Sequence, residues 1–345
     1  MTDDELRRLA NVMMYEGYLL YPYRPSVKNV RRWTFGSLYP RAHAERRGER
    51  SHLRTEVLVE GGADTSVCMS LRFLQVQERL IRRFDASGEE NAAREECFTP
   101  VASLDVAGET FLTWQEGVEH ELALGSAGLE FLAERSVFAA VRRSGQRSRE
   151  LLRDLDGTVV GDVVRERREI LGGVDVSAQA INEHLRRLLI TVRNQTVMTD
   201  PEDALDAERR GLMGTHLILR AERGRFLSLT DPPADRAAVA ATCANEGCWP
   251  VLVGDRETSD ALLVSPIILP DFPELAPESP GDLFDGTEID EILSLRIRTL
   301  TDSEKKLVDS VDPRARALLA RTERLTRGEL VALHGTWRPA RKEVP

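Results

Sequence analysis

The sequence predicts an α+β protein with an antiparallel, β-rich core, a sandwich or an open barrel, with flanking helices and a helical C-terminal tail. Segments of alternating apolar and polar residues recur from residue 55 to residue 269, separated by turns and long connections that suit antiparallel pairing. Beyond Gly286 the apolar residues recur at helical spacing instead, and Asp312-Pro313 is typical of a helix start. These two patterns determine the predicted fold class.

Three regions are expected along the chain. Residues 1–150 form an N-terminal α+β region, residues 151–285 a β-rich domain, and residues 286–345 the helical tail. A chain of 345 residues is long enough for two domains, which agrees with two folded regions and a tail.

The N-terminal region begins with a predicted amphipathic helix over residues 3–15. Strands are predicted from Thr55 onward, with a turn at Gly61-Gly62. The alternation changes phase at Phe73-Leu74, which indicates a β-bulge. Residues 85–96 are polar and are expected to form a loop.

Helices are predicted over residues 113–124 and 129–141, and at the start of the first one Thr113 and Glu116 have the spacing of a capping box. A later helix is predicted from Asp200-Pro201 to Arg210, and another over residues 236–244. Short strands are predicted at residues 159–164, 170–171, 188–192, 216–221, 226–229, 251–253 and 262–269.

Composition bounds the class of protein. The formal net charge of −10 argues against nucleic acid as the partner. No apolar run reaches the roughly 20 residues of a membrane-spanning helix, and the N-terminus has no signal-peptide core. Four cysteines are too few for a disulfide scaffold. We expect a cytoplasmic protein without membrane insertion.

A basic segment runs from Arg24 to Arg54, with nine Lys or Arg residues and only two acids, Glu45 and Glu49. Aromatic residues are interleaved with it. One interpretation is a surface for nucleic acid or an acidic protein partner. The other is that the aromatic residues belong to the core and the arginines to a solvated rim. The partner-binding candidates are Arg24, Lys28, Arg31, Arg32, Trp33 and Tyr39.

An acidic segment, Asp271–Glu291, holds eight carboxylates and no Lys or Arg. Prolines in and beside it exclude a helix or central strand, because proline fixes φ and lacks a backbone donor. Its apolar residues indicate an ordered connector that docks a partner. Its carboxylates could instead hold Mg²⁺ or Ca²⁺, or cap a helix. The candidates are Asp282, Asp285, Glu288 and Asp290.

Motifs of common enzyme chemistry are absent from the sequence. There is no Gly-Lys dipeptide of a P-loop, no G-x-G-x-x-G after a strand, and no G-x-S-x-G nucleophile elbow. Cys243 and Cys248 have no second cysteine pair nearby, so small buried residues explain them better than a metal site. The six histidines show no metal-ligand spacing, and His216 is expected to be a satisfied histidine in a sheet. We expect no cofactor.

Four segments of the sequence are distinctive: residues 16–41 (EGYLLYPYRPSVKNVRRWTFGSLYPR), 226–233 (FLSLTDPP), 249–254 (WPVLVG) and 265–293 (SPIILPDFPELAPESPGDLFDGTEIDEIL). They resemble a bacterial, mainly actinobacterial, protein family encoded beside nickel–iron hydrogenase genes. The resemblance implies an accessory, assembly or structural role, with hydrogenase subunits or maturation factors as partners. It implies no catalytic or binding residue.

The sequence therefore favours a non-enzymatic accessory protein that acts through protein–protein surfaces. The first alternative is a metal-handling protein or enzyme that uses the carboxylates of residues 282–291 or the cysteines. The second alternative is a nucleic-acid-binding protein that uses the segment Arg24–Arg54.

Overall fold

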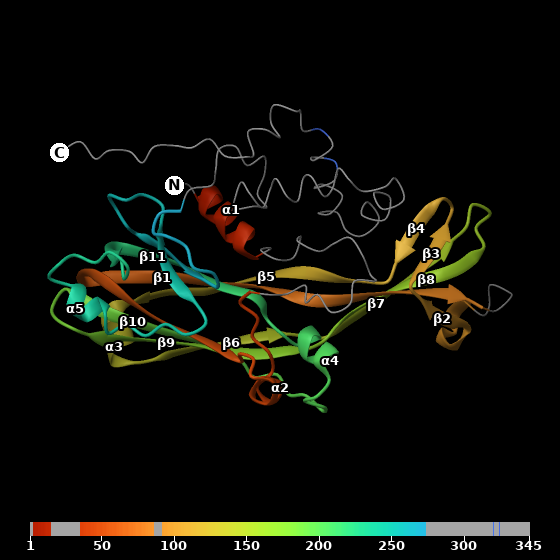
Figure 1. Cartoon of the computed structure of the whole chain (residues 1–345), viewed down its shortest axis with the longest axis horizontal. Coiled ribbons are helices and arrows are strands. Elements are labelled where there is room, and N and C mark those ends of the chain that lie inside the picture. The colour runs from red at the N-terminus through yellow and green to blue at the C-terminus, as the bar shows by residue number, and fades with distance from the viewer. Residues whose placement is uncertain (1–2, 15–34, 86–91, 274–319, 321–323, 325–345) are drawn as a thin grey trace.

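The computed structural model describes residues 3–14, 35–85 and 92–273, with the single residues 320 and 324 (Figure 1). The predicted helical tail lies outside the described residues. So do nine of the ten partner-binding candidates: Arg24, Lys28, Arg31, Arg32, Trp33, Asp282, Asp285, Glu288 and Asp290.

One antiparallel sheet of eleven strands makes up most of the described chain. Its strands are β1 (His52–Phe84), β2 (Phe98–Val101), β5 (Trp114–Gly128), β6 (Val137–Arg143), β7 (Gln146–Arg153), β8 (Val159–Arg167), β9 (Ile170–Ala180), β10 (Leu185–Asn194), β11 (Met213–Leu227), β12 (Trp249–Val253) and β13 (Ala261–Ser265). In the broad part of the molecule they lie in two layers, with β11, β1 and β5 over β10, β9 and β6 (Figure 1). The β-rich, antiparallel fold class is confirmed, and the sheet does not close into a barrel.

Strand β1 is the central strand of this sheet, because it pairs with five other strands. Along one edge it pairs with β10 through residues 52–60, with β5 through 66–79 and with β2 through 81–84. Along the other edge it pairs with β11 through residues 58–74 and with β8 through 77–83. The first half of β1 thus belongs to the lower layer and the second half to the upper layer.

The passage between the layers is a bulged corner. Residues 62–65 of β1 lie opposite only Arg223 of β11, which has a φ of 55°. The fully buried Thr65 fills the corner, and its hydroxyl donates a hydrogen bond to the Arg223 carbonyl at 2.7 Å. Strands that change layers commonly do so at such a bulge. The turn predicted at Gly61-Gly62 is therefore a corner within one continuous strand.

The two layers enclose a single large hydrophobic core. Inward-facing residues alternate along β1, where Val67, Leu71 and Phe73 are all fully buried. The short helix α3 (Leu129–Glu134) adds Leu129 and Leu132 to the same core.

Helix α1 (Asp3–Met14) lies on the outer face of the upper layer (Figure 1). Four of its residues form a second apolar cluster with β12 and β13: Leu6, Leu9, Ala10 and Met13 pack with Val251, Val253, Ala261 and Leu263. The amphipathic helix predicted over residues 3–15 is confirmed.

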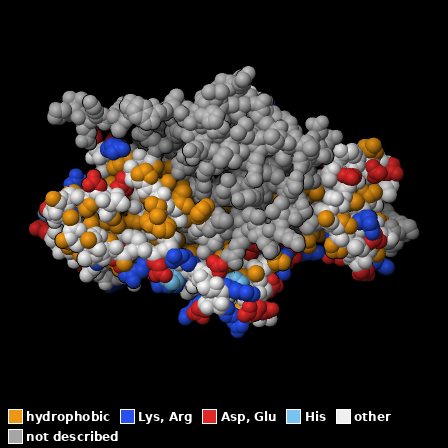
Figure 2. Space-filling view, viewed as in Figure 1, with side chains coloured by type: hydrophobic (Ala, Val, Ile, Leu, Met, Phe, Trp, Pro, Cys, Tyr) orange, Lys and Arg blue, Asp and Glu red, His pale blue; other side chains and the backbone are white. Residues whose placement is uncertain are grey.

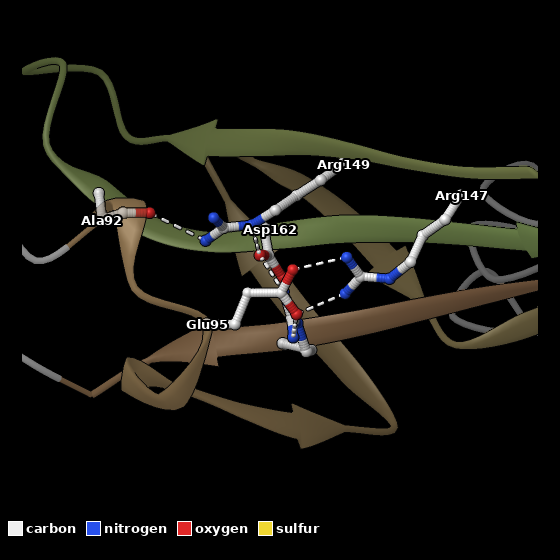
Figure 3. A network of polar contacts seen from close by, with 6 residues as sticks. Ala92, Glu95, Arg147, Arg149 and Asp162 are labelled. Atoms are coloured by element: carbon white, nitrogen blue, oxygen red, sulfur yellow. Dashed lines mark hydrogen bonds and ion pairs between the residues drawn. The ribbon is translucent and has the colours of Figure 1, made fainter.

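Beyond the core, β1 continues into a narrower extension with β2, β7 and β8, and with the two-stranded sheet of β3 (Ser103–Val106) and β4 (Glu109–Leu112) (Figure 1). A buried ion-pair network lies inside this extension. The fully buried carboxylate of Asp162 contacts the guanidinium group of Arg149 (Figure 3). It also contacts that of Arg82.

Two predicted helices are wrong. Residues 114–128 form β5, which pairs along residues 66–79 of β1. Thr113 caps no helix; its hydroxyl donates to the Val101 carbonyl at 2.7 Å and accepts from the Ile81 N–H at 2.9 Å. Of residues 129–141 only α3 is helical, and β6 follows, pairing with β9.

Other predictions hold with shifted boundaries. The bulge at Phe73-Leu74 is confirmed, because the register between β1 and β11 shifts there. The predicted strands 216–221 and 226–229 are one strand, β11. Helix α4 (Ala204–Arg209) is capped by Asp203, whose carboxylate accepts backbone hydrogen bonds, and not by Asp200. Helix α5 (Ala237–Ala240) is shorter than predicted, and α2 (Arg41–Arg47) was not predicted.

The sheet joins strands from both sides of residue 150, since β6 pairs with β9 and β7 pairs with β8. The expected boundary at residue 150 therefore does not coincide with a break in the sheet, and the one at residue 285 lies outside the described residues. None of the described helices has the length and apolar character needed to cross a membrane.

Candidate functional site

Three of the four distinctive segments meet at Asp271. One carboxylate oxygen of Asp271 accepts a hydrogen bond from the backbone N–H of Leu252 at 2.8 Å. The other accepts hydrogen bonds from the hydroxyls of Ser228 at 2.5 Å and Thr230 at 3.1 Å. The first carboxylate of the acidic segment is therefore structural, because it joins residues 226–233 to residues 249–254.

The fourth segment reaches the same region through Phe35 and Gly36. Gly36 has a φ of 59°, and a Cβ there would lie 2.7 Å from the Cβ of Pro266, so only glycine permits this approach. A pocket of about 340 Å³ forms here, lined by Phe35, Tyr39, Trp249 and Pro266 among others. Phe35 is 39% exposed and Trp249 is 40% exposed. We call this site the aromatic pocket.

A larger groove of about 1120 Å³ adjoins the aromatic pocket, and Glu49 and Arg50 line both. One wall is the segment 41–54, which includes α2. The other wall is the outer face of β9 and β10, where Asp175 and Thr191 point away from the core. The groove therefore runs between the described end of the basic segment and the lower layer of the sheet.

Local sequence explains how α2 is held at this groove. The helix begins after Pro40 and ends at Gly48, which has the left-handed conformation that glycine adopts at helix ends. His43 is buried, and its Nδ1–H donates to the Pro201 carbonyl at 2.7 Å. Tyr39, a predicted partner-binding residue, is only 6% exposed, with its ring 5.6 Å from that of His43. Tyr39 thus packs α2 onto the fold.

The described arginines of the basic segment pair with carboxylates of the same chain. Figure 2 shows basic and acidic side chains intermingled around α2 at the lower edge of the molecule. The hydrogen bond from Arg46 lowers the pKa of Glu202, as does the nearby charge of Arg47. The pairs are Arg41 with Glu45, Arg46 and Arg47 with Glu202, Arg50 with Glu246, and Arg54 with Glu56. A phosphate backbone would have to displace these carboxylates.

The cysteines of the loop beside this groove are protonated thiols. Burial raises the pKa of the Cys248 thiol to about 12, and burial also raises that of Cys243. The Cys248 thiol donates to the Arg54 carbonyl at 3.2 Å. All four cysteines are free, and no group of three or more His, Cys, Asp or Glu residues among the described ones is placed to hold a metal ion. The metal-handling alternative gains no support from Cys243 and Cys248.

His216 is a buried histidine in β11, as predicted, but only one of its ring nitrogens is satisfied. Its Nδ1–H donates to the Gly214 carbonyl at 2.7 Å, while its Nε2 has no hydrogen-bond partner among the described residues. Burial lowers the pKa of His216 to about 4. The imidazole is therefore neutral at physiological pH.

This burial predicts an acid-sensitive fold. The unfolded chain binds a proton on His216 below about pH 6.5, whereas the folded chain does so only near pH 4. The contribution of neutral His216 to the free energy of unfolding is therefore fully present above pH 6.5 and decreases as the pH falls towards 4. At pH 5 this decrease amounts to about 2 kcal/mol. Urea unfolding at pH 7 and pH 5 should show a smaller difference for His216→Gln than for the unmodified chain. Equal differences would contradict the assignment.

No protein-family model matches the chain, and no curated protein matches it. The resemblance to a hydrogenase-linked family stays a prediction.

Sequence reasoning missed the aromatic pocket, because it used Trp249 only as part of the distinctive segment 249–254. The sequence contained one signal of the pocket: aromatic residues stand next to glycines, which permit two backbone segments to approach closely. Examples are Phe35 beside Gly36 and Trp249 near Gly247. The segments that form the pocket are far apart in sequence, so their meeting could not be derived from spacing.

Proposed function

We propose that the chain is a non-enzymatic accessory protein that binds a protein partner through the aromatic pocket and the adjoining groove. A hydrogenase subunit or maturation factor is the partner class that the sequence resemblance implies. The observation that carries the proposal is Trp249, which is 40% exposed beside a pocket and close to the 39% exposed Phe35.

Half-exposed tryptophans beside pockets are the usual anchors of protein interfaces, since they bury a large apolar area on binding. Trp249 opens β12, an edge strand that pairs only with β13 among the described strands. Pro250 follows it and lacks a backbone donor, which disfavours further strand pairing along this edge. The interaction expected here is therefore through side chains and not through sheet extension.

The size and charge of the groove favour a polypeptide as its occupant. Pockets for small molecules measure about 300–1,000 Å³ and are mostly apolar. This groove measures about 1120 Å³ and carries charges of both signs, such as Arg50 with Glu246 and Arg193 with Asp175. Paired charges at an interface rim orient a partner and select against wrong ones.

The test is Trp249→Ala in the full-length chain, with tagged protein recovered from the native organism and the partners quantified by mass spectrometry. A hydrogenase subunit or maturation factor should be recovered with the unmodified chain and reduced about tenfold or more with Trp249→Ala. Direct binding is then measured by calorimetry with the purified partner.

Leu155→Ala is the matched control. Leu155 is 88% exposed in the turn between β7 and β8, at the far end of the extension. It should leave partner binding unchanged. If both variants retain the same partners at the same level, the aromatic pocket is not the docking site.

A further inference from the structure

Where β1 leaves the core, Arg143 of β6 is held by a neutral histidine instead of a carboxylate. Its Nε donates a hydrogen bond to Nδ1 of His120 at 2.9 Å, and its Nη1 donates to the Arg142 carbonyl at 2.8 Å. The opposite ring nitrogen of His120 is hydrogen-bonded to Oε1 of Gln75 at 2.9 Å. Because Nδ1 accepts from a guanidinium, His120 carries its proton on Nε2 and is uncharged.

Gln75 holds this arrangement in place. Its side chain is fully buried in β1, and its amide nitrogen donates to the Arg168 carbonyl at 2.6 Å. That bond fixes the amide orientation, so Oε1 of Gln75 must face His120 as an acceptor. The positions of His120 and Arg143 are therefore set by a hydrogen-bond chain that contains no negative charge.

A second guanidinium, that of Arg167, lies at the end of β8. Arg167 pairs with Gln77 of β1 on one side and Gln146 of β7 on the other. The turn that follows Arg143 lies against it, because a Cβ on Gly145 would be 3.3 Å from the Arg167 carbonyl oxygen. Nη2 of Arg167 donates to the side-chain oxygen of Gln146, and its Nε is buried without a hydrogen-bond partner in the part of the chain that the structure describes. Burial, together with the charges of Arg143 and Arg167, lowers the pKa of His120 to about 4.

The carboxylates on the surrounding elements are engaged elsewhere. These are Glu116 with Arg79, Glu119 and Glu121 with Arg72, and Glu166 and Asp206 with Arg168. Within the described residues, neither Arg143 nor Arg167 forms an ion pair with a carboxylate. Two positive charges thus have no carboxylate partner within residues 3–14, 35–85 and 92–273, in a chain whose formal net charge is −10.

We propose that Arg143 and Arg167 form a binding site for an oxyanion, a phosphate or a carboxylate group. Guanidinium groups present paired N–H donors that match the oxygens of both groups. His120 is a positioning residue that orients Arg143. The site is separate from the aromatic pocket, and its occupancy does not depend on the proposed partner.

The test is calorimetric titration of the full-length chain with sodium phosphate and, separately, with sodium acetate, against sodium chloride at matched ionic strength. Saturable one-to-one binding of either oxyanion is expected, and the preferred one identifies the ligand class. Arg143→Gln and Arg167→Gln should each weaken binding about tenfold, the usual effect of losing a charge-assisted hydrogen bond. Arg142→Gln is the control, because this exposed neighbour lies on the opposite face of β6.

His120 supplies a second measurement through its imidazole NMR signals. A bound negative charge favours the imidazolium, so the saturating oxyanion should raise the pKa of His120 from its low starting value. The proposal is overturned if chloride gives the same heats, if Arg142→Gln weakens binding as much as Arg143→Gln, or if the pKa of His120 does not move. Thermal unfolding of each variant confirms that loss of binding is not loss of the fold.

Discussion

Replacing Asp162 with asparagine is expected to lower the free energy of unfolding by about 3 to 5 kcal/mol. The Asp162 carboxylate is fully buried in β8. It accepts two hydrogen bonds from Arg82, at 2.9 and 2.7 Å. It accepts another from Arg149 at 2.5 Å (Figure 3). Asparagine has the same shape but no charge, so two guanidinium groups would stay in the interior of the extension without their counter-ion.

The surroundings give these arginines few other ways to be stabilised. The guanidinium of Arg149 lies 4.4 Å from the centre of the Phe98 ring and donates to the Ala92 carbonyl at 2.9 Å. Arg82 also reaches Glu95 at 3.2 Å, at the exposed end of the network. Hydrogen bonding to Asp162 raises the pKa of Arg82 in the unmodified chain, and a guanidinium stays protonated at pH 7 even without that partner, so Arg82 keeps its charge in the variant.

The measurement is urea unfolding at pH 7, with Glu95→Gln as the control. Hydrogen bonds from Arg147 and then Arg82 lower the pKa of Glu95 to about 2, but water screens this exposed carboxylate. Glu95→Gln should therefore lower the free energy of unfolding much less than Asp162→Asn does. Similar unfolding midpoints for the two variants would show that the charge of Asp162 is not what the extension requires.

The second large effect is expected at the corner of β1, where Gly61→Ala should cost about 3 kcal/mol. A Cβ on Gly61 would lie 2.1 Å from the Thr65 hydroxyl oxygen and 3.1 Å from the Arg223 carbonyl oxygen. The first contact is shorter than any that side chains tolerate. The bulge would have to open, which would disturb the passage of β1 and β11 between the layers.

A double-mutant cycle separates this clash from a general intolerance of the strand. Thr65→Ala removes the hydroxyl, so Gly61→Ala should cost less in that background than in the unmodified chain. Gly62→Ala is the matched control, because a Cβ there would meet only the Asp64 carboxylate at 3.3 Å. Strictly additive losses at Gly61 and Thr65 would rule out the steric explanation.

Local patterns in the sequence predicted many strands of this fold and few of their partners. The alternation in residues 188–192 predicted part of β10, and the phase change at Phe73-Leu74 predicted the bulge in β1. In β5, Val118, His120 and Leu122 also alternate with glutamates, but the capping-box spacing was given more weight. Residues 114–128 form a strand and not a helix because they pair with β1, about 45 residues earlier in the chain, and local spacing does not encode that pairing.

The candidate site was predictable only as a region of the surface. The basic segment was recognised from its arginines, and its described half does line the groove. That Arg46 and Arg47 are neutralised by Glu202 could not be derived, because this carboxylate lies more than 150 residues later in the sequence. Asp271 likewise belonged to a segment rich in carboxylates, and only the fold shows that it bonds the backbone of Leu252.

The length of β1 also has a consequence for biosynthesis. Its residues 52–60 find their partners only when residues 185–194 have left the ribosome, and its middle needs residues 213–227 as well. Residues 66–84 of β1 can pair earlier with β5 and β2, but until residues 185–194 emerge, residues 52–60 lack their β10 partner, and such non-local β pairing is slow and exposes the nascent chain to aggregation. Synthesis of this protein in a foreign host is therefore expected to depend on the supply of chaperones that shield extended apolar segments.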